Sequence, residues 1–185
     1  MANSSVIDTE RLRIEPFSSE HLTERYVGWL SDQEVVKFSE QRYVKHTLDS
    51  CRAYWYSFSG TPNFFWALVV KDSEIGHVGN VTAYVDRSRS SADLGILVGE
   101  RRVWNKGYGR EAWLAVCRYL FEREDISRIT AGTLVVNQAM LGIMRSAGMV
   151  RDEQRNGKSL YQGAEVDFYY GVLNRASFLS EDDRL

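Results

Sequence analysis

Cysteine, proline and long apolar runs are scarce in this sequence, and neither sign of charge dominates it. Two cysteines and two prolines occur among 185 residues, and the formal net charge is −2. Cys51 and Cys117 have neither the spacing of a metal site nor that of a disulfide framework, so we expect free thiols in a reducing compartment and no metal ion. The nearly balanced charge argues against a nucleic-acid binder that works through overall basicity.

The hydropathy pattern argues against two further classes of protein. No apolar run approaches the length of a membrane span. The first residues, "MANSSVIDTERLRIEP", lack the apolar core of a secretory signal peptide. We therefore predict a cytoplasmic protein without membrane association. Hydrophobic residues make up 44% and charged residues 26% of the chain, a balance typical of globular proteins, and the length favours one domain.

Apolar patterns divide the chain into strands and helices. Strands are predicted where β-branched and aromatic residues alternate or cluster between turns. Helices are predicted where apolar residues recur at helical spacing behind a capping residue. The predicted strands are 11–17, 64–70, 75–85, 92–99, 128–136 and 165–173, and the predicted helices are 18–30, 32–38, 48–58, 110–124 and 137–149. This order joins antiparallel hairpins to one crossover, which is an α+β, or mixed α/β, layout.

The stretch "RRVWNKGYGREAW" (101–113) places a basic, glycine-containing turn between a strand and a helix. The first backbone N–H groups of a helix have no internal partners and carry the positive end of its dipole. Glycines allow an anion to approach the backbone closely, and Lys106 and Arg110 add positive charge. The turn therefore predicts a phosphate-binding site. The alternative is an ordinary glycine-containing loop ahead of a surface helix.

The stretch "ILVGERRVWNKGYGREA" (96–112) resembles the acetyl-CoA pyrophosphate signature of the GNAT superfamily of N-acetyltransferases. Trp104 takes the Arg/Gln place of that signature, and Gly107 and Gly109 take the places of its two fixed glycines. The tryptophan variant is typical of the RimJ/RimL-like branch, although Asn105 stands where that branch usually has glycine.

Two further stretches carry the same resemblance. "VVNQAMLGIMRSAGM" is similar to the Asn-led helix of the superfamily, and "TERLRIEPF" with "WLSDQEVVKF" is similar to the RimJ/RimL-like opening. The resemblance covers roughly residues 8 to 173, so we expect a single GNAT domain at 8–173 and a C-terminal tail at 174–185. It implies a mostly antiparallel, twisted central sheet of about six to seven strands flanked by helices.

The resemblance also implies a cofactor and the residues that hold it. Acetyl-CoA would be the acyl donor, with no metal. Its pantetheine arm would pair with exposed backbone, and its pyrophosphate would lie on the N–H groups of the turn. Asn137 would bond the cofactor arm or orient the loop, with a helix N-cap as the alternative or additional role. The implied cofactor-binding residues are Ile96, Leu97, Val98, Asn105, Lys106, Gly107, Tyr108, Gly109, Arg110 and Asn137.

Acetyl transfer to an amine needs a proton acceptor for the amine and a proton for the leaving thiolate. Many members of the superfamily place a tyrosine in the Asn-led helix to protonate the thiolate, but the matching residue here is Met144. Asp93 and His46 are the candidate catalytic bases, and Glu100 and His77 are weaker candidates. The first two also have structural alternatives, which are a strand-end hydrogen bond for Asp93 and a solvated loop position for His46.

The acceptor site is predicted to be built by the N-terminal helices and the last strand. Tyr43, Asp167 and Tyr169 are its candidate residues, with the polar side of an edge strand as the alternative reading of the last two. The predicted function is acetyl transfer to a primary amine of a small molecule such as an amino sugar. A protein N-terminal acetyltransferase and a non-catalytic acyl-CoA-binding module are the alternatives, and the oligomeric state stays open, with a homodimer among the options.

Overall fold

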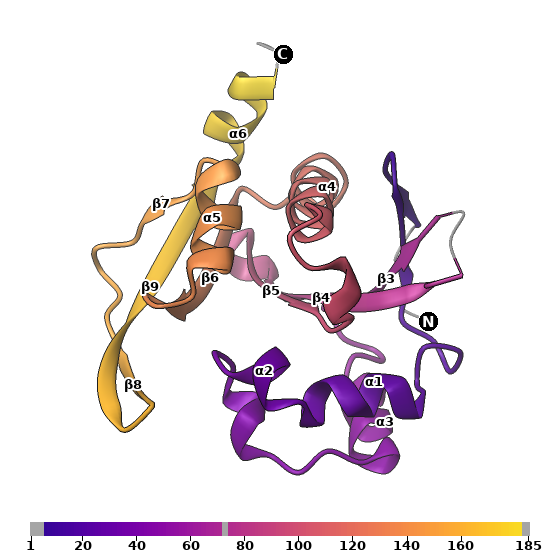
Figure 1. Ribbon diagram of the computed structural model, residues 1–185. Helices are drawn as coiled ribbons and strands as arrows, with labels where there is room; N and C mark the ends of the chain where they lie inside the picture. Colours follow the sequence, from indigo (N-terminus) through magenta and orange to yellow (C-terminus); the bar gives the residue numbers. More distant parts are fainter. Residues whose placement is uncertain (1–5, 72–73, 183–185) are drawn as a thin grey trace.

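A nine-stranded sheet forms the centre of the molecule (Figure 1). The computed structural model describes residues 6–71 and 74–182. Along the sheet the order is β1-β2-β3-β4-β5-β6-β9-β7, with β8 paired to β9. The strands are β1 (Ile7–Asp8), β2 (Leu12–Pro16), β3 (Phe64–Val70), β4 (His77–Asp86), β5 (Ser91–Val98), β6 (Arg128–Leu134), β7 (Val150–Arg151), β8 (Lys158–Tyr161) and β9 (Ala164–Asn174).

The predicted α+β class and the mostly antiparallel sheet are confirmed. Every neighbouring pair of strands is antiparallel except β5 and β6, which are parallel. The expected count of six to seven strands was too low, because β1 and β7 have two residues each and β8 has four. Segments that short show no alternation that could distinguish them from loops.

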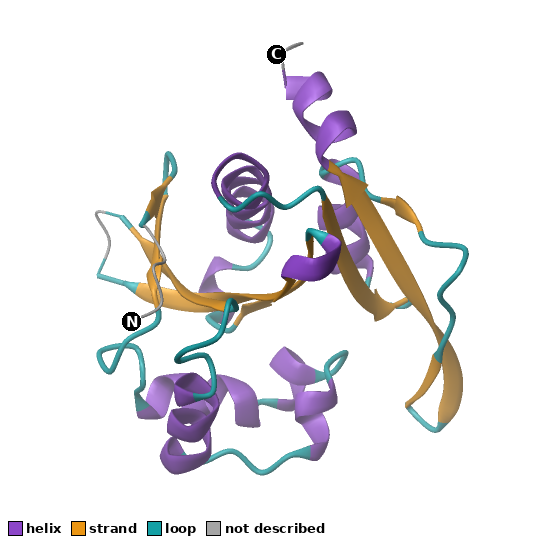
Figure 2. Cartoon of the chain, turned by 180° about the vertical axis from the view of Figure 1, so that it is seen from behind, coloured by secondary structure: helices purple, strands orange, loops and turns teal. Residues whose placement is uncertain are grey.

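Helices lie on both sides of the sheet (Figures 1 and 2). The N-terminal helices are grouped on one face, and α4 crosses the other. The α-helices are α1 (Glu24–Ser31), α2 (Gln33–Val36), α3 (Leu48–Tyr56), α4 (Tyr108–Arg123), α5 (Gln138–Ser146) and α6 (Arg175–Asp182), and the 3-10 helices are η1 (Glu40–Tyr43), η2 (Arg87–Arg89) and η3 (Arg101–Val103). Within the described residues, no helix is long and apolar enough to cross a bilayer.

Capping residues set the starts of the N-terminal helices. Thr47 caps α3, the helix predicted at 48–58, in a reciprocal capping box with Ser50. The expected start of the first helix at residue 18 was wrong, because Thr23 caps α1 by accepting from the Tyr26 N–H. Ser18 instead donates its backbone N–H to His21 Nδ1 at 3.0 Å, which holds the preceding residues in a turn.

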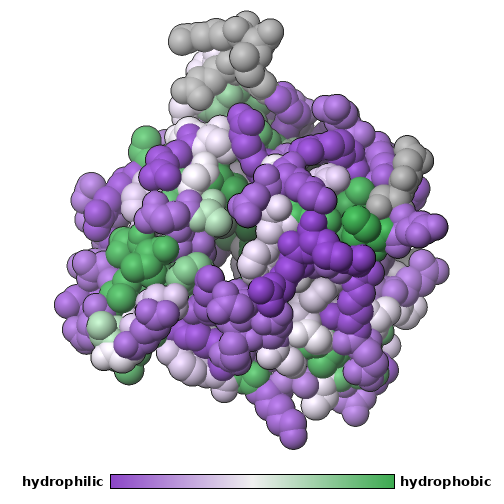
Figure 3. All heavy atoms as spheres, viewed as in Figure 1, coloured by the Kyte–Doolittle hydropathy of each residue, from purple (hydrophilic) through white to green (hydrophobic). Residues whose placement is uncertain are grey.

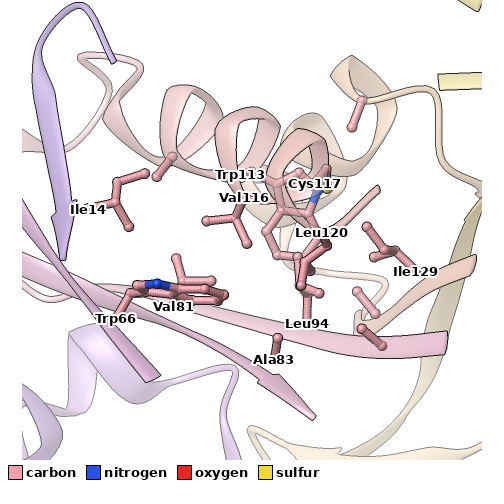
Figure 4. Packing of buried hydrophobic residues seen from close by; sticks show 14 of the residues in the cluster. Ile14, Trp66, Val81, Ala83, Leu94, Trp113, Val116, Cys117, Leu120 and Ile129 are labelled. Carbon is pink, nitrogen blue, oxygen red and sulfur yellow. The ribbon is translucent and has the colours of Figure 1, made fainter. Parts of the chain in front are cut away.

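The main core lies between α4 and the sheet (Figure 4). Trp66 on β3 and Trp113 on α4 are both fully buried there. Along β5, Ala92 and Leu94 face this core, whereas Asp93 between them is exposed on the opposite side. A second apolar cluster packs α1 and α3 against that opposite side, which we call the α1–α3 face of the sheet.

The C-terminal segment belongs to the same packed unit. Of the residues expected as a tail, Asn174 completes β9 and Arg175–Asp182 form α6, whereas 183–185 lie outside the described residues. Phe178 of α6 is buried, and its ring lies 5.4 Å from that of Phe121 on α4.

Candidate active site

The parallel strands β5 and β6 pair over only part of their length. Their pairing covers Ser91–Asp93 of β5 and stops there. Beyond Asp93, no strand in the described part of the chain pairs with β5 residues 94–98 on the β6 side, and we call this stretch the open edge of β5. It includes Ile96, Leu97 and Val98. Figure 3 shows a hollow near the middle of the molecular surface, over β5 and between α5 and the turn that precedes α4.

The turn after β5 is fixed to the end of the strand by Trp104. The indole Nε1–H of Trp104 donates to the Val98 carbonyl oxygen at 2.8 Å. Asn105 and Gly107 both have positive φ, at 61° and 84°. Asparagine and glycine are the residues that adopt this region at least cost. Asn105 therefore meets the same backbone demand as the glycine that the RimJ/RimL-like pattern has at this position.

Helix α4 begins at the turn with its first donors unused. Gly107 is its N-cap residue, and no side chain caps it. The N–H groups of Tyr108, Gly109 and Arg110 have no acceptor in the part of the chain that the structure describes. Such a helix start attracts phosphate through its aligned N–H groups and dipole. A Cβ at Gly109 would lie 3.1 Å from Ile143 Cδ1 and 3.4 Å from Val98 Cγ2, so glycine permits this close packing.

Arg11 and Glu111 hold the turn against the N-terminal strands. Glu111 accepts from Thr9 Oγ1 at 2.6 Å, from the Arg11 N–H at 2.8 Å and from Arg11 Nε at 2.7 Å. Arg11 also donates to the Lys106 carbonyl oxygen at 2.8 Å and lies over the Tyr108 ring. Partial burial alone would raise the pKa of Glu111, but the hydrogen bonds from Thr9 and Arg11 hold that pKa below its usual value. Sequence analysis missed this anchor, since the partners are about a hundred residues apart.

Asn137 caps α5, as one of the two readings expected. Its Oδ1 accepts from the Met140 N–H at 3.2 Å, and its Nδ2 donates to Thr133 Oγ1 at 3.0 Å. Met144 is only 1% exposed, and its Cε lies 3.3 Å from the position that a Cβ on Gly171 would take. The side chain at this position is therefore part of the core.

Asp93 lies at the end of the β5–β6 pairing, on the α1–α3 face. Its Oδ2 accepts from Thr130 Oγ1 at 2.6 Å and lies 3.7 Å from Arg155 Nη1. Tyr84 stands opposite Asp93 on β4. The guanidinium of Arg155 lies 4.2 Å above the ring of Tyr170 on β9. Four strands and one loop thus place a carboxylate, a cation and three hydroxyls close together.

A hydroxyl pair continues this polar surface. Tyr54 of α3 and Tyr84 of β4 share a hydrogen bond of 2.7 Å between their Oη atoms. Burial raises the pKa of Tyr54, and the hydrogen bond with Tyr84 raises it further. The Tyr54 phenol therefore remains protonated at neutral pH and can act as a hydrogen-bond donor.

The remaining predicted site residues lie apart from Asp93. His46 occupies the loop before α3, with Nε2 3.2 Å from the Gln41 carbonyl oxygen. Tyr43 on η1 donates its hydroxyl to the Leu160 carbonyl oxygen at 3.1 Å, so it joins the β8–β9 hairpin. Tyr169 packs against the main core rather than on the α1–α3 face, and alternation along β9 puts the exposed Asp167 on the same side of the strand. Tyr170 is the β9 tyrosine that faces Asp93's side.

The two weaker candidate bases, His77 and Glu100, have partners that give each of them a structural role. His77 lies among the rings of Phe17, His21 and Trp29. Burial lowers the pKa of His77 to about 3, with His21 contributing to the shift, so it is neutral at physiological pH. Glu100 forms ion pairs with Arg102 at 2.9 Å and Arg25 at 3.2 Å.

Among the described residues, no three His, Cys, Asp or Glu side chains come together as a possible metal site.

Comparison with known proteins identifies the family. The acetyltransferase (GNAT) domain model matches residues 11–150 of this chain. No curated protein matches the sequence significantly. Because the domain model covers more than half of the chain, the chain belongs to the GNAT acetyltransferase family, as the sequence motifs indicated.

Solved structures of the family have the same fold. A GNAT-family acetyltransferase from Bacillus anthracis is 23% identical, with a TM-score of 0.76 over 93% of this chain and 99% of that one. The Vibrio cholerae spermidine N-acetyltransferase in complex with CoA and spermine is 12% identical, with a TM-score of 0.80 over 92% and 99%. RimL, a ribosomal L7/L12 alpha-N-protein acetyltransferase in complex with CoA, is 13% identical, with a TM-score of 0.75 over 92% and 98%.

Proposed function

We propose that this protein transfers an acetyl group from acetyl-CoA to the primary amine of a small molecule such as an amino sugar. The observation that carries the proposal is the combination of two unpaired backbone surfaces at one place. The unused N–H groups at the start of α4 follow the open edge of β5 in the chain, after η3 and the turn at 104–107. Together they offer a phosphate site and an extended edge to which an amide-containing chain can bind.

The residues of the turn fit the coenzyme. The N–H groups from Asn105 to Arg110 would hold the pyrophosphate, and Lys106 would add a positive charge. The open edge at Ile96, Leu97 and Val98 would hydrogen-bond the pantetheine arm. Asn137 would act through its cap, which fixes the start of α5 beside this edge. Acetyl-CoA supplies an activated thioester, and the chain supplies position and proton transfer.

Asp93 is the proposed general base. Its carboxylate lies where the β5–β6 pairing ends, and it is exposed on the α1–α3 face. An amine bound there would give its proton to Asp93 directly or through water. His46 is the alternative base, since its loop joins η1 to α3 on the same side of the sheet.

The polar groups around Asp93 favour a hydroxylated amine over a polyamine. Tyr84, Thr130 and Tyr170 offer hydroxyls, and the guanidinium of Arg155 beside Asp93 would repel a polycation. Acidic side chains that could hold several ammonium groups are not gathered here within the described residues.

A thiol-release assay tests the proposal. The protein would be incubated with acetyl-CoA and a panel of amino sugars, aminoglycosides, polyamines, amino acids and short peptides. Turnover of a small amine supports the proposal. Turnover of peptides alone would favour the protein N-terminal activity, and tight CoA binding without turnover of any amine would favour the binding module.

A further inference from the structure

Arg155 differs from the arginines that serve the fold. Arg42 has a side chain only 9% exposed and donates to Ser39 O, Tyr43 Oη, Ser159 Oγ and Leu160 O. By contrast, the Arg155 side chain is 44% exposed, and its closest charged partner, Asp93 Oδ2, lies 3.7 Å away. Its guanidinium makes no closer polar contact with any described residue. Its N–H donors are therefore free for a ligand.

The backbone that carries Arg155 is nevertheless firmly placed. Asp152 is buried and forms an ion pair with Arg128 at 2.8 Å. The Asp152 N–H donates to the Tyr170 carbonyl oxygen at 2.8 Å, and the Asp152 carbonyl accepts from the Arg155 N–H at 3.2 Å. Asp152 Oδ1 also accepts from the Gln154 N–H at 3.2 Å. This turn ties the loop between β7 and β8 to both β6 and β9.

The guanidinium itself is also positioned. It lies 4.2 Å above the centroid of the Tyr170 ring. The Tyr170 ring covers Gly132 of β6, where a Cβ would lie 2.9 Å from the ring. Glycine at position 132 thus allows the tyrosine to lie flat on the sheet beneath the arginine. The stacked ring restricts the guanidinium plane, which reduces the entropy lost when it binds a ligand.

Asp93 and Arg155 therefore present one negative and one positive group at the end of the open edge of β5. An amine directed toward Asp93 leaves Arg155 next to whatever substituent the acceptor carries beyond its amine. Guanidinium groups bind carboxylates and phosphates through paired N–H donors. The free donors of Arg155 are suited to such an oxyanion and unsuited to a second ammonium.

We infer that the acceptor of this enzyme carries an oxyanion, a carboxylate or a phosphate, close to the amine that is acetylated, and that Arg155 binds it. This inference rests on the proposed function, because it names the acceptor class of that same site. Arg155 acts in specificity, and Asp93 remains the residue that handles the proton.

Matched pairs of amines test the inference. Glucosamine is compared with glucosamine 6-phosphate, and alaninamide with alanine, so that each pair differs by a phosphate or a carboxylate. Charged hydrogen bonds of this kind predict a kcat/KM roughly 10- to 100-fold higher for the anionic member of at least one pair. The pair that shows the preference identifies the oxyanion. In Arg155→Gln the preference should fall to near one, mainly through KM, and Arg155→Lys should retain part of it.

Arg151→Gln is the matched control. Arg151 lies on β7 with its guanidinium 6.0 Å from the Tyr169 ring, away from Asp93. This variant should keep the parental preference. A parent that acetylates the neutral members as well as the anionic ones would overturn the inference. So would an Arg155→Gln variant that keeps the preference, or one that loses both members of a pair equally.

A binding experiment distinguishes failure of this inference from failure of the proposed function. Calorimetry would measure each of the four probes on the CoA-bound protein and on its Arg155→Gln variant. Binding of an anionic probe that depends on Arg155, without acetylation of any amine, would contradict the proposed function and support the oxyanion site. Acetylation of amines with no anion-dependent binding or kinetics would support the proposed function and contradict the oxyanion site.

Discussion

Replacing Glu111 by glutamine tests whether the turn before α4 is held in place from the N-terminal strands. The carboxylate accepts three hydrogen bonds from Thr9 and Arg11, and Arg11 in turn bonds the Lys106 carbonyl of the turn. The Glu111 side chain is only 16% exposed. Glutamine keeps the shape but offers one acceptor oxygen in place of two, and its NH2 group faces the donors of Arg11.

The expected loss follows from the bonds that Glu111→Gln breaks. Hydrogen bonds to a charged group contribute roughly 1.5–3 kcal/mol, and one such bond is lost outright, so we expect about 2 kcal/mol of destabilisation. For a chain of this size, that lowers the melting temperature by roughly 4–8 °C. The affinity for CoA should fall several-fold, because Lys106 loses its support.

Thermal melts and calorimetry with CoA measure both effects. Glu122→Gln is the matched control, since Glu122 lies on the same helix in a looser ion pair with Arg118 at 3.7 Å, and exposed pairs contribute little. The reasoning is refuted if Glu111→Gln melts within about a degree of the control and binds CoA as tightly as the parent.

The lowered pKa of Glu111 also predicts how the effect of Glu111→Gln depends on pH. The pKa of Glu111 is lower in the folded protein than its usual value. The carboxylate therefore stabilises the fold fully above its unfolded pKa of about 4.3, and this contribution is lost as the pH falls through the folded pKa. The difference in melting temperature between parent and Glu111→Gln should be largest near pH 7 and should shrink in acid below about pH 4.

Three further variants test the proposed site. Gly107→Val forces a β-branched residue to a φ of 84° and should abolish measurable CoA binding in calorimetry; parental affinity would place the pyrophosphate elsewhere. Asp93→Asn should lower kcat/KM by roughly 100-fold with CoA affinity unchanged, and a flat pH profile at parental rates would remove Asp93 from the mechanism. His46→Ala should alter acceptor KM or preference and leave kcat within a few-fold of the parent, whereas a loss as large as that of Asp93→Asn would make His46 the base.

Local signals in the sequence were sufficient for the parts of the fold that depend on neighbouring residues. The aromatic and β-branched run 64–70 is β3 to the residue. Thr47 caps α3, and α4 begins after the turn at Gly107, two residues before the expected start. In each case the signal is a backbone or capping requirement that the local sequence alone satisfies.

The acceptor side could not be read in the same way, since its residues meet only through tertiary contacts. Sequence analysis chose Tyr169 on β9, whereas the register with β6 turns Tyr170 to the α1–α3 face. Arg155 reaches Asp93 from a loop whose position depends on the pair between Asp152 and Arg128. No periodicity or spacing in the sequence indicates that contact.

Methionine at position 144 bears on whether the protein is an enzyme or a binding module. A thiol has an ordinary pKa of about 8.5, so expelling it as a thiolate at pH 7 costs about 2 kcal/mol relative to the thiol. An alkylamine has a pKa of about 10, so supplying its neutral form at pH 7 costs about 4 kcal/mol. Removing the amine proton is therefore the larger requirement, and Asp93 is the residue proposed to meet it. Met144 contributes packing to the core instead of a proton, which is compatible with turnover.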